Sequence, residues 1–222
     1  MKGPLLTRFD LIVFDWDGTL MDSAAAIVAA IQAGCRDLRV EPPSDARARH
    51  IIGLGLEDGL QWALPELPAA SYAALAERYR HHFLARDEEL VLFEGVGEML
   101  AGLAGAGHFL GVATGKSRRG LDRALADSGL AGLFHATRCV DECYSKPHPQ
   151  MLHQLMEEFA ASAERTLMIG DTTHDLKMAK NAGVAALAVA YGAHPRAELL
   201  AEKPLYCADN VTELRTWLAT NA

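Results

Sequence analysis

Two aspartates that follow a short apolar run are the first groups in the chain whose types and spacing could do chemistry. Residues 11–14 form the run, Asp15 and Asp17 come directly after it, and Gly18 and Thr19 follow. Such a run predicts a strand buried on both faces of a parallel sheet. In open α/β sheets, ligands bind beyond the carboxyl ends of the strands. We therefore interpret Asp15 as a nucleophile and Asp17 as a proton donor and acceptor.

Further polar residues follow later predicted strands: Thr114, Lys146, Asp171 and Asp175. Because the carboxyl ends of parallel strands share one edge, these groups can converge although they are far apart in sequence. Carboxylates and a backbone carbonyl are the oxygen ligands that Mg²⁺ prefers, and a lysine supplies a point charge for a phosphoryl group. Backbone N–H groups near Gly115 can approach an anion at a helix start. Together these are the parts of a phosphoryl-transfer site.

The elements that must position these groups alternate between strand and helix after residue 92. Strands are predicted over 11–14, 109–113, 134–138, 166–169, 185–189 and 205–207. Only helices are predicted between the first strand and residue 91, over 24–38, 45–50, 58–63 and 69–86, with Ser23 as a capping residue of the first. The pattern predicts an α/β fold with a doubly wound parallel sheet. Residues 1–22 and 92–222 would form its core domain, and residues 23–91 an inserted helical cap domain.

Composition limits the partners and the compartment. Half of the 222 residues are apolar and the formal net charge is −8, which argues against a nucleic acid or an anionic membrane as partner. The start lacks a signal-peptide core and no apolar run is long enough to cross a bilayer, so a cytoplasmic protein is expected. Cys139, Cys143 and His148 lack the spacing of common structural zinc sites, and the four cysteines are expected to be free thiols.

At these residues the sequence resembles haloacid-dehalogenase-superfamily hydrolases with a small helical cap, similar to phosphoglycolate phosphatases. The motifs that carry the resemblance are Asp15-Trp16-Asp17-Gly18-Thr19, Thr114-Gly115-Lys116, Lys146-Pro147, and Gly170-Asp171 with Asp175. The resemblance implies a Rossmann-like sheet, an aspartyl-phosphate on Asp15, and Asp17 as the acid and then the base. It also implies that Asp15, the Asp17 carbonyl and Asp171 bind Mg²⁺, with Asp175 acting behind them.

Several positions leave alternatives open. Gly115 stands where many relatives have Asn, which leaves the phosphate contact to the backbone. Lys116 is either a second anion contact or a solvated lysine at a helix start, and Arg47 or Arg49 either holds a substrate carboxylate or lies on a solvated helix face. His174 is expected to pack or to face solvent rather than to bind metal.

Missing residues narrow the reaction expected from the resemblance. The dehalogenase branch lacks the second aspartate, which is present here, and phosphonate-cleaving relatives use a cap lysine, whereas residues 23–91 contain none. Sugar-phosphate mutases have a His where this chain has Ile27. The leading interpretation is a Mg²⁺-dependent phosphatase of a small phosphate ester, with 2-phosphoglycolate first among the candidates.

Other functions stay open at this point. A pyrophosphatase or a sugar-phosphate mutase on the same scaffold is the alternative enzyme. A non-catalytic phospho-aspartate switch, as in bacterial receiver domains, ranks lowest, because those domains lack a cap and the acid two residues after the nucleophile. The sequence leaves open whether the protein is a monomer or a homodimer.

Overall fold

Strand β1 (Leu11–Phe14) lies at the centre of a six-stranded parallel sheet because all four of its side chains are apolar and buried. The computed structural model describes residues 8–86 and 89–222. Its strand order is β3-β2-β1-β4-β5-β6. The other strands are β2 (Phe109–Thr114), β3 (Ala136–Cys139), β4 (Thr166–Gly170), β5 (Ala185–Val189) and β6 (Tyr206–Ala208).

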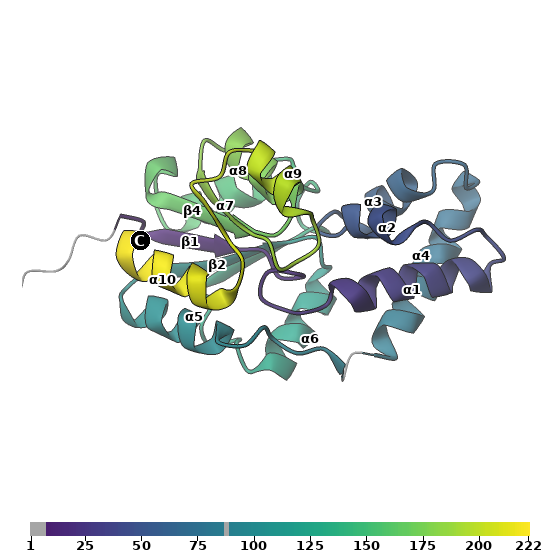
Figure 1. Ribbon diagram of the computed structural model, residues 1–222, viewed down its shortest axis with the longest axis horizontal. Coiled ribbons are helices and arrows are strands. Elements are labelled where there is room, and N and C mark those ends of the chain that lie inside the picture. Colours follow the sequence, from purple (N-terminus) through teal and green to yellow (C-terminus); the bar gives the residue numbers. More distant parts are fainter. Residues whose placement is uncertain (1–7, 87–88) are drawn as a thin grey trace, which may run out of the picture.

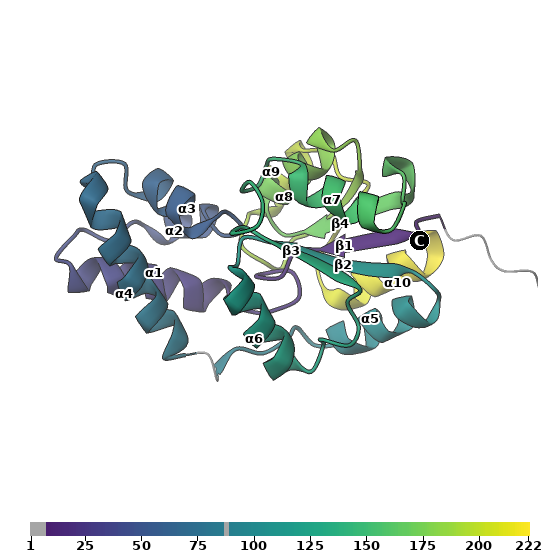
Figure 2. The same cartoon turned by 180° about the vertical axis from the view of Figure 1, so that it is seen from behind.

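Helices cover both faces of the sheet, as alternation along β1 requires. Ile12 and Phe14 pack toward one group of helices, whereas Leu11 and Val13 pack toward the other. Figures 1 and 2 show these two helical layers on opposite sides of the sheet. The first layer contains α5 (Val96–Gly105), α6 (Arg118–Ser128) and α10 (Val211–Asn221). The second contains α7 (Gln150–Glu158), α8 (Thr173–Asn181) and α9 (Arg196–Ala201), with the short η3 (Ala163–Arg165) before β4.

The helices between β1 and α5 pack around a hydrophobic cluster of their own, at the right of Figure 1. Apolar side chains from α1 and α4, such as Ile31 and Leu75, fill that cluster. We propose that this segment is the cap domain expected over residues 23–91. Its elements are α1 (Ala24–Asp37), α2 (Asp45–His50), α3 (Leu56–Ala63), η1 (Ala69–Ser71) and α4 (Tyr72–Leu84).

The two chain segments that lead into and out of these helices run side by side. Met21 and Leu92 form an isolated antiparallel bridge. The N–H of Asp22 donates to the Val91 carbonyl at 2.9 Å, and the N–H of Phe93 donates to the Leu20 carbonyl at 3.0 Å. A paired, two-stranded connection of this kind holds the cap helices above the carboxyl end of β1.

Most predicted elements are present, with shifts at their ends. The strand expected over 134–138 begins two residues later, and the helix expected over 69–86 divides into η1 and α4. Helices α9 and α10 were not expected from the sequence. The described residues contain no helix that is both long and apolar enough to span a bilayer.

Shortening a buried side chain of β1 should show how much the packing of the central strand contributes to stability. We expect Ile12→Ala to lower the free energy of unfolding by about 2–5 kcal/mol, because it removes a completely buried side chain from the packed sheet. The control is Leu205→Ala, at a side chain about half exposed, where we expect a change of less than about 0.5 kcal/mol. Equilibrium urea denaturation measures both, and equal effects would contradict this packing.

Candidate active site

Asp15 ends β1 in a completely buried position and faces a buried lysine. The Nζ atom of Lys146 lies 2.7 Å from Oδ1 of Asp15 and 2.6 Å from Oδ1 of Asp175. Within residues 8–86 and 89–222, the second oxygen of Asp15, Oδ2, has no hydrogen-bond partner. A buried carboxylate oxygen is costly without a partner, so this atom is available to a ligand or a reacting group.

Asp171 and Asp175 come from the end of β4 and the first turn of α8, and neighbouring donors fix both. Asp171 accepts hydrogen bonds from the Thr19 hydroxyl at 2.8 Å and from the Ala193 N–H at 2.7 Å. Oδ2 of Asp175 accepts from the Thr172 hydroxyl at 2.6 Å and from the Thr172 N–H at 3.1 Å. The Asp175 N–H donates back to the Thr172 hydroxyl oxygen at 3.4 Å, which completes a capping box. The carboxylates are therefore held in place before any ligand arrives.

Asp15, Asp171 and Asp175 each place one carboxylate oxygen within 4.8 Å of the others. Burial raises the pKa of Asp15 well above its usual range, and the charges of Asp175 and Asp171 act in the same direction against Lys146. The charges of Asp15 and Asp175 raise the pKa of Lys146, although burial opposes this. Three buried carboxylates with one lysine carry an excess of negative charge that a cation would balance.

The chemistry and the close packing of this cluster fit a Mg²⁺ ion. The donors are all oxygen atoms, and Oδ2 of Asp15 is free to bind. A Cβ atom on Gly18, whose φ is +81°, would lie 2.2 Å from Oδ2 of Asp171, and one on Gly192 would lie 2.3 Å from the same oxygen. Glycine is required at both positions because the backbone approaches the carboxylate closely. Asp15, Asp171 and Asp175 would hold the ion, and ligation by the Asp17 carbonyl stays a prediction.

Asp17 lies outside this cluster of carboxylates and is held by two side chains. Lys116 Nζ lies 2.9 and 3.0 Å from the two carboxylate oxygens, and the Ser23 hydroxyl donates to Oδ1 at 2.7 Å. Ser23 is the N-cap residue of α1, as expected, but its hydroxyl makes no capping bond to the helix. Lys116 is mostly buried and paired with Asp17, so it is not a solvated lysine, and its role as a second anion contact stays a prediction.

Thr114 and Gly115 lie where β2 meets the loop of the cap that follows α2. Thr114 is buried, and its hydroxyl accepts a hydrogen bond from the Lys116 N–H at 3.2 Å. A Cβ atom on Gly115 would lie 2.4 Å from the Leu54 carbonyl and 2.6 Å from the Gly53 carbonyl. Glycine in place of the frequent Asn therefore allows the cap loop to lie directly on the core.

A group of histidines adds a second contact between cap and core, at the end of α2 where the same loop begins. His174 Nε2 lies 2.7 Å and His194 Nε2 3.1 Å from the His50 carbonyl at the end of α2, where no further helical turn bonds to it. The His50 ring stacks on His194 and on Trp62. Burial lowers the pKa of His174 to about 4, so it is neutral near pH 7 and can donate. Of the two expected roles of His174, packing is therefore the one that the structure shows, between α8 and the end of α2.

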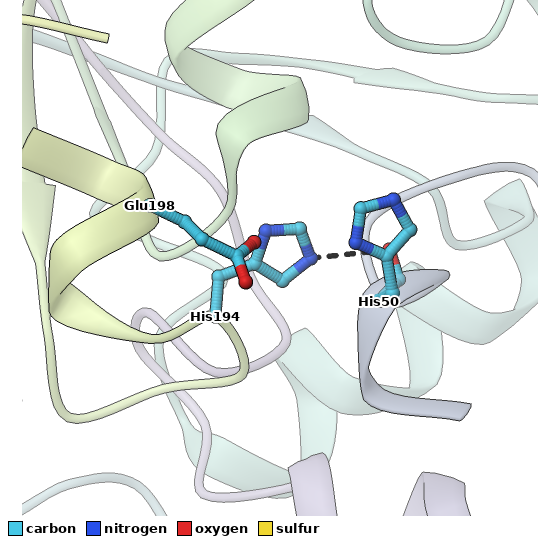
Figure 3. A group of neighbouring side chains, drawn as sticks. All are labelled: His50, His194 and Glu198. Carbon is cyan, nitrogen blue, oxygen red and sulfur yellow. Dashed lines mark hydrogen bonds between the residues drawn. The ribbon is translucent and has the colours of Figure 1, made fainter. Parts of the chain in front are cut away.

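Figure 3 shows His50, His194 and Glu198 close enough together to suggest metal ligands. Both ring nitrogens of His194 are already used, since Nδ1 accepts from the Thr173 N–H at 3.1 Å and Nε2 contacts the His50 carbonyl. A metal ion would have to break one of these bonds. We therefore interpret the group as a contact that holds the cap on the core.

Arg47 and Arg49, the cap residues considered for a substrate carboxylate, lie on α2. Arg47 donates to the Trp62 and Ala63 carbonyls and lies over the Trp62 ring, so its contacts are within the cap. Arg49 is half-buried and is not among the residues that line the pocket between cap and core. Its role in substrate binding stays a prediction.

The family model described as haloacid dehalogenase-like hydrolase matches residues 12–189 of the chain. The chain belongs to this family.

Relatives of this hydrolase carry several names. It is 38% identical to the probable phosphatase IndB of Dickeya dadantii (strain 3937), over 92% of this chain and 91% of the relative. It is 33% identical to a 5′-nucleotidase of Pseudomonas aeruginosa, over 91% and 92% of the two chains. It is 30% identical to a phosphoglycolate phosphatase of Vibrio parahaemolyticus, over 96% and 97%. The protein is a phosphatase-like enzyme of this family.

The fold agrees with solved structures. A hydrolase from Pseudomonas syringae superposes with a TM-score of 0.85 at 21% identity, over 96% of this chain and 99% of the other. At that identity the likeness concerns the fold, which is the expected doubly wound sheet with added helices.

The structure adds residues to this hydrolase's site that the sequence reasoning missed. Thr19, Thr172 and Ser23 each donate a hydroxyl hydrogen bond to one of the aspartates. Thr19 and Thr172 lie within the acidic motifs. Their position next to the aspartates could have predicted that their hydroxyl groups bind these carboxylates. The Ala193 N–H, distant in sequence, left no such signal.

Adding one methyl group at Gly18 should remove the cation site. We expect Mg²⁺ to raise the melting temperature of the wild type but not that of Gly18→Ala, because the new Cβ would lie 2.2 Å from Asp171 Oδ2 and displace this carboxylate. Gly107→Ala is the control, since Gly107 also has a positive φ, +94°, but no described atom lies within 4 Å of its added Cβ. It should cost about 1–2 kcal/mol of backbone strain and keep the Mg²⁺ response. The same response in both variants would contradict this site.

The effect of Mg²⁺ on stability should increase with pH. Burial and the charge of Asp175 raise the pKa of Asp171 to about 7 from a value of 3.8. The stability that protonated Asp171 contributes is present in full below about pH 4 and is lost as the pH rises through about 7. Mg²⁺ binds the ionised form, so it should raise the melting temperature more at pH 8 than at pH 5.

The matched control for this pH effect is Asp171→Asn, in which the difference between the two pH values should shrink. Melting curves with EDTA and with Mg²⁺ measure it in both proteins. An equal Mg²⁺ effect at both pH values in the wild type would show that these carboxylates do not bind the ion.

Proposed function

We propose that the protein is a Mg²⁺-dependent phosphatase that hydrolyses a phosphate monoester of a small metabolite through an aspartyl-phosphate on Asp15. The observation that carries the proposal is the Asp15 carboxylate, which Lys146 holds through one oxygen while the other has no hydrogen-bond partner among the described residues. Asp17, two residues later, lies on the wall of the pocket between cap and core, where a leaving group would be protonated.

In the first step an Asp15 oxygen attacks phosphorus, and the bond from phosphorus to the ester oxygen breaks. Asp17 gives a proton to that departing oxygen, which leaves as an alcohol. In the second step Asp17 takes a proton from a water molecule that attacks the phosphorus of the aspartyl-phosphate. Phosphate leaves and Asp15 is regenerated, so atoms and protons balance over the cycle.

The other polar groups stabilise charge and fix geometry. Lys146 neutralises Asp15 and approaches the transferring group as a point charge. Lys116 and Ser23 hold the Asp17 carboxylate in place, and Thr114 lies at the end of the adjacent strand. A bound Mg²⁺ would supply the positive charge that offsets the charge of the phosphoryl oxygens and of the three carboxylates.

Substrate candidates come from the relatives and from the sequence interpretation. The relatives include enzymes named 5′-nucleotidase and phosphoglycolate phosphatase, and 2-phosphoglycolate was the first candidate of the sequence analysis. We propose both phosphate esters as test substrates, with pyrophosphate to test the alternative enzyme.

Replacing the two aspartates should affect hydrolysis of p-nitrophenyl phosphate differently. We expect Asp15→Asn to abolish turnover, because the amide cannot form the intermediate. Asp17→Asn should lower kcat by roughly 10²–10⁴-fold, the usual contribution of general acid–base catalysis. The control is Asp22→Asn, at an exposed aspartate near the site in sequence, which should keep wild-type rates.

EDTA should remove the activity and added Mg²⁺ should restore it. Turnover by Asp15→Asn, or full activity of the wild type in EDTA, would contradict the proposed function.

A further inference from the structure

A pocket of about 910 Å³ lies between the cap helices and the edge of the sheet that carries the active site. Pockets of a few hundred to about a thousand cubic ångströms accept ligands of drug size. Asp17, the proposed acid, lines the pocket, so the alcohol that leaves the phosphate would begin its path there. This volume is far larger than a two-carbon acid needs.

The cap contributes an apolar wall to this pocket. Ile27 and Ile31 come from α1, one turn apart, and Ile52 comes from the loop after α2. Tyr79 and Phe83 come from α4, also one turn apart. Residues four apart lie on the same helix face, so both helices present their side chains to the pocket together.

The aromatic pair lies close to the proposed acid. The rings of Tyr79 and Phe83 stack with centroids 5.7 Å apart, and Lys116 Nζ lies 4.9 Å from the centroid of Phe83. The same Nζ contacts both oxygens of Asp17 at 2.9 and 3.0 Å. Burial and the charge of Asp17 raise the pKa of Tyr79, which keeps its phenol protonated. The first atoms of a leaving group at Asp17 are therefore next to an aromatic surface.

The charges on the pocket wall do not favour a small second anion. Among the described residues, four basic and five acidic side chains line it. The basic ones include Lys116, which is paired with Asp17, and Arg80, which is the one cap arginine on the described wall. Arg47 is occupied within the cap and Arg49 is off the wall. In the cap, a substrate carboxylate such as that of 2-phosphoglycolate would therefore find one basic side chain on the described wall, that of Arg80.

We propose that the physiological substrate is a phosphate monoester of a bulky, ring-bearing alcohol of about nucleoside size, whose ring packs against Tyr79 and Phe83. This inference rests on the proposed function and specifies its substrate class. The ring lies on the apolar wall, and the polar side chains of the core side of the pocket face its hydroxyl groups. Tyr79 and Phe83 are then the residues that determine specificity.

Steady-state kinetics of the wild type with Mg²⁺ test the substrate class. The panel contains uridine 5′-monophosphate and adenosine 5′-monophosphate as ring-bearing esters, with 2-phosphoglycolate and pyrophosphate as small anions. We expect kcat/KM to be about tenfold or more higher for the better nucleotide than for either small anion, because the ring buries apolar surface. An equal or higher kcat/KM for 2-phosphoglycolate would overturn the inference.

Tyr79→Leu and Phe83→Leu test the aromatic wall. We expect each to lower the ratio of kcat/KM for the nucleotide to that for 2-phosphoglycolate by about three- to tenfold, the usual contribution of an aromatic contact. The matched control is Tyr144→Leu, because Tyr144 is 67% exposed and lies outside the wall. It should keep the wild-type ratio. An unchanged ratio in both folded wall variants would overturn the roles of these two rings.

Failure of this inference differs from failure of the proposed function. If 2-phosphoglycolate is the best substrate and hydrolysis still requires Asp15 and Mg²⁺, only the inference about the substrate class is wrong. If pyrophosphate is the best substrate, the protein is the alternative enzyme, and the proposed function is wrong together with the inference. If the wild type hydrolyses none of the four compounds or p-nitrophenyl phosphate with Mg²⁺, the proposed function is wrong as well.

Discussion

The structure depends on a cluster of three buried carboxylates, two of which form ion pairs with one buried lysine. Lys146 contacts Asp15 and Asp175 directly, and Asp171 lies within the same cluster without an ion pair to any lysine of the part of the chain that the structure describes. Charges so far from water are stable only when paired, so the cluster needs either protons or a cation. The raised pKa values of Asp15 and Asp171 mean that these carboxyl groups bind protons more readily than usual. A bound Mg²⁺ ion would instead balance the charge of the ionised carboxylates. The protonation of Asp15, the proposed nucleophile, therefore depends on the charges buried around it.

The sheet and a few glycines make this crowding possible. Parallel strands β1 and β4 end side by side, which brings Asp15 and Asp171 together across a long separation in sequence. Gly18 and Gly192 leave room for the Asp171 carboxylate, and Gly115 leaves room for the cap loop. The lack of a side chain at Gly115 allows the cap loop to lie on the core next to the site. The site and the cap contact are therefore parts of one packing arrangement.

The sequence was sufficient for features that depend on local pattern and on strand ends. The apolar run before Asp15 placed β1, and alternation of strands and helices placed the sheet that brings Asp171 and Lys146 to it. It was insufficient for side chains whose partners come from elsewhere in the fold. Ser23 is the N-cap residue of α1, yet its hydroxyl donates to Asp17 and not to the helix. Lys116 could not be assigned, because its partner lies 99 positions away. The contacts of His174 and His194 with the His50 carbonyl join segments far apart in sequence, and no motif predicts that these segments meet.

The central claim is that Asp15 carries the phosphoryl group. Its most direct test is to quench the enzyme with acid during turnover, reduce it with borohydride and map the peptides by mass spectrometry. Borohydride reduces an acyl phosphate on aspartate to homoserine. The account predicts this change at Asp15 alone, and only when substrate and Mg²⁺ were both present. Homoserine at another aspartate, or at none during rapid turnover, would contradict it.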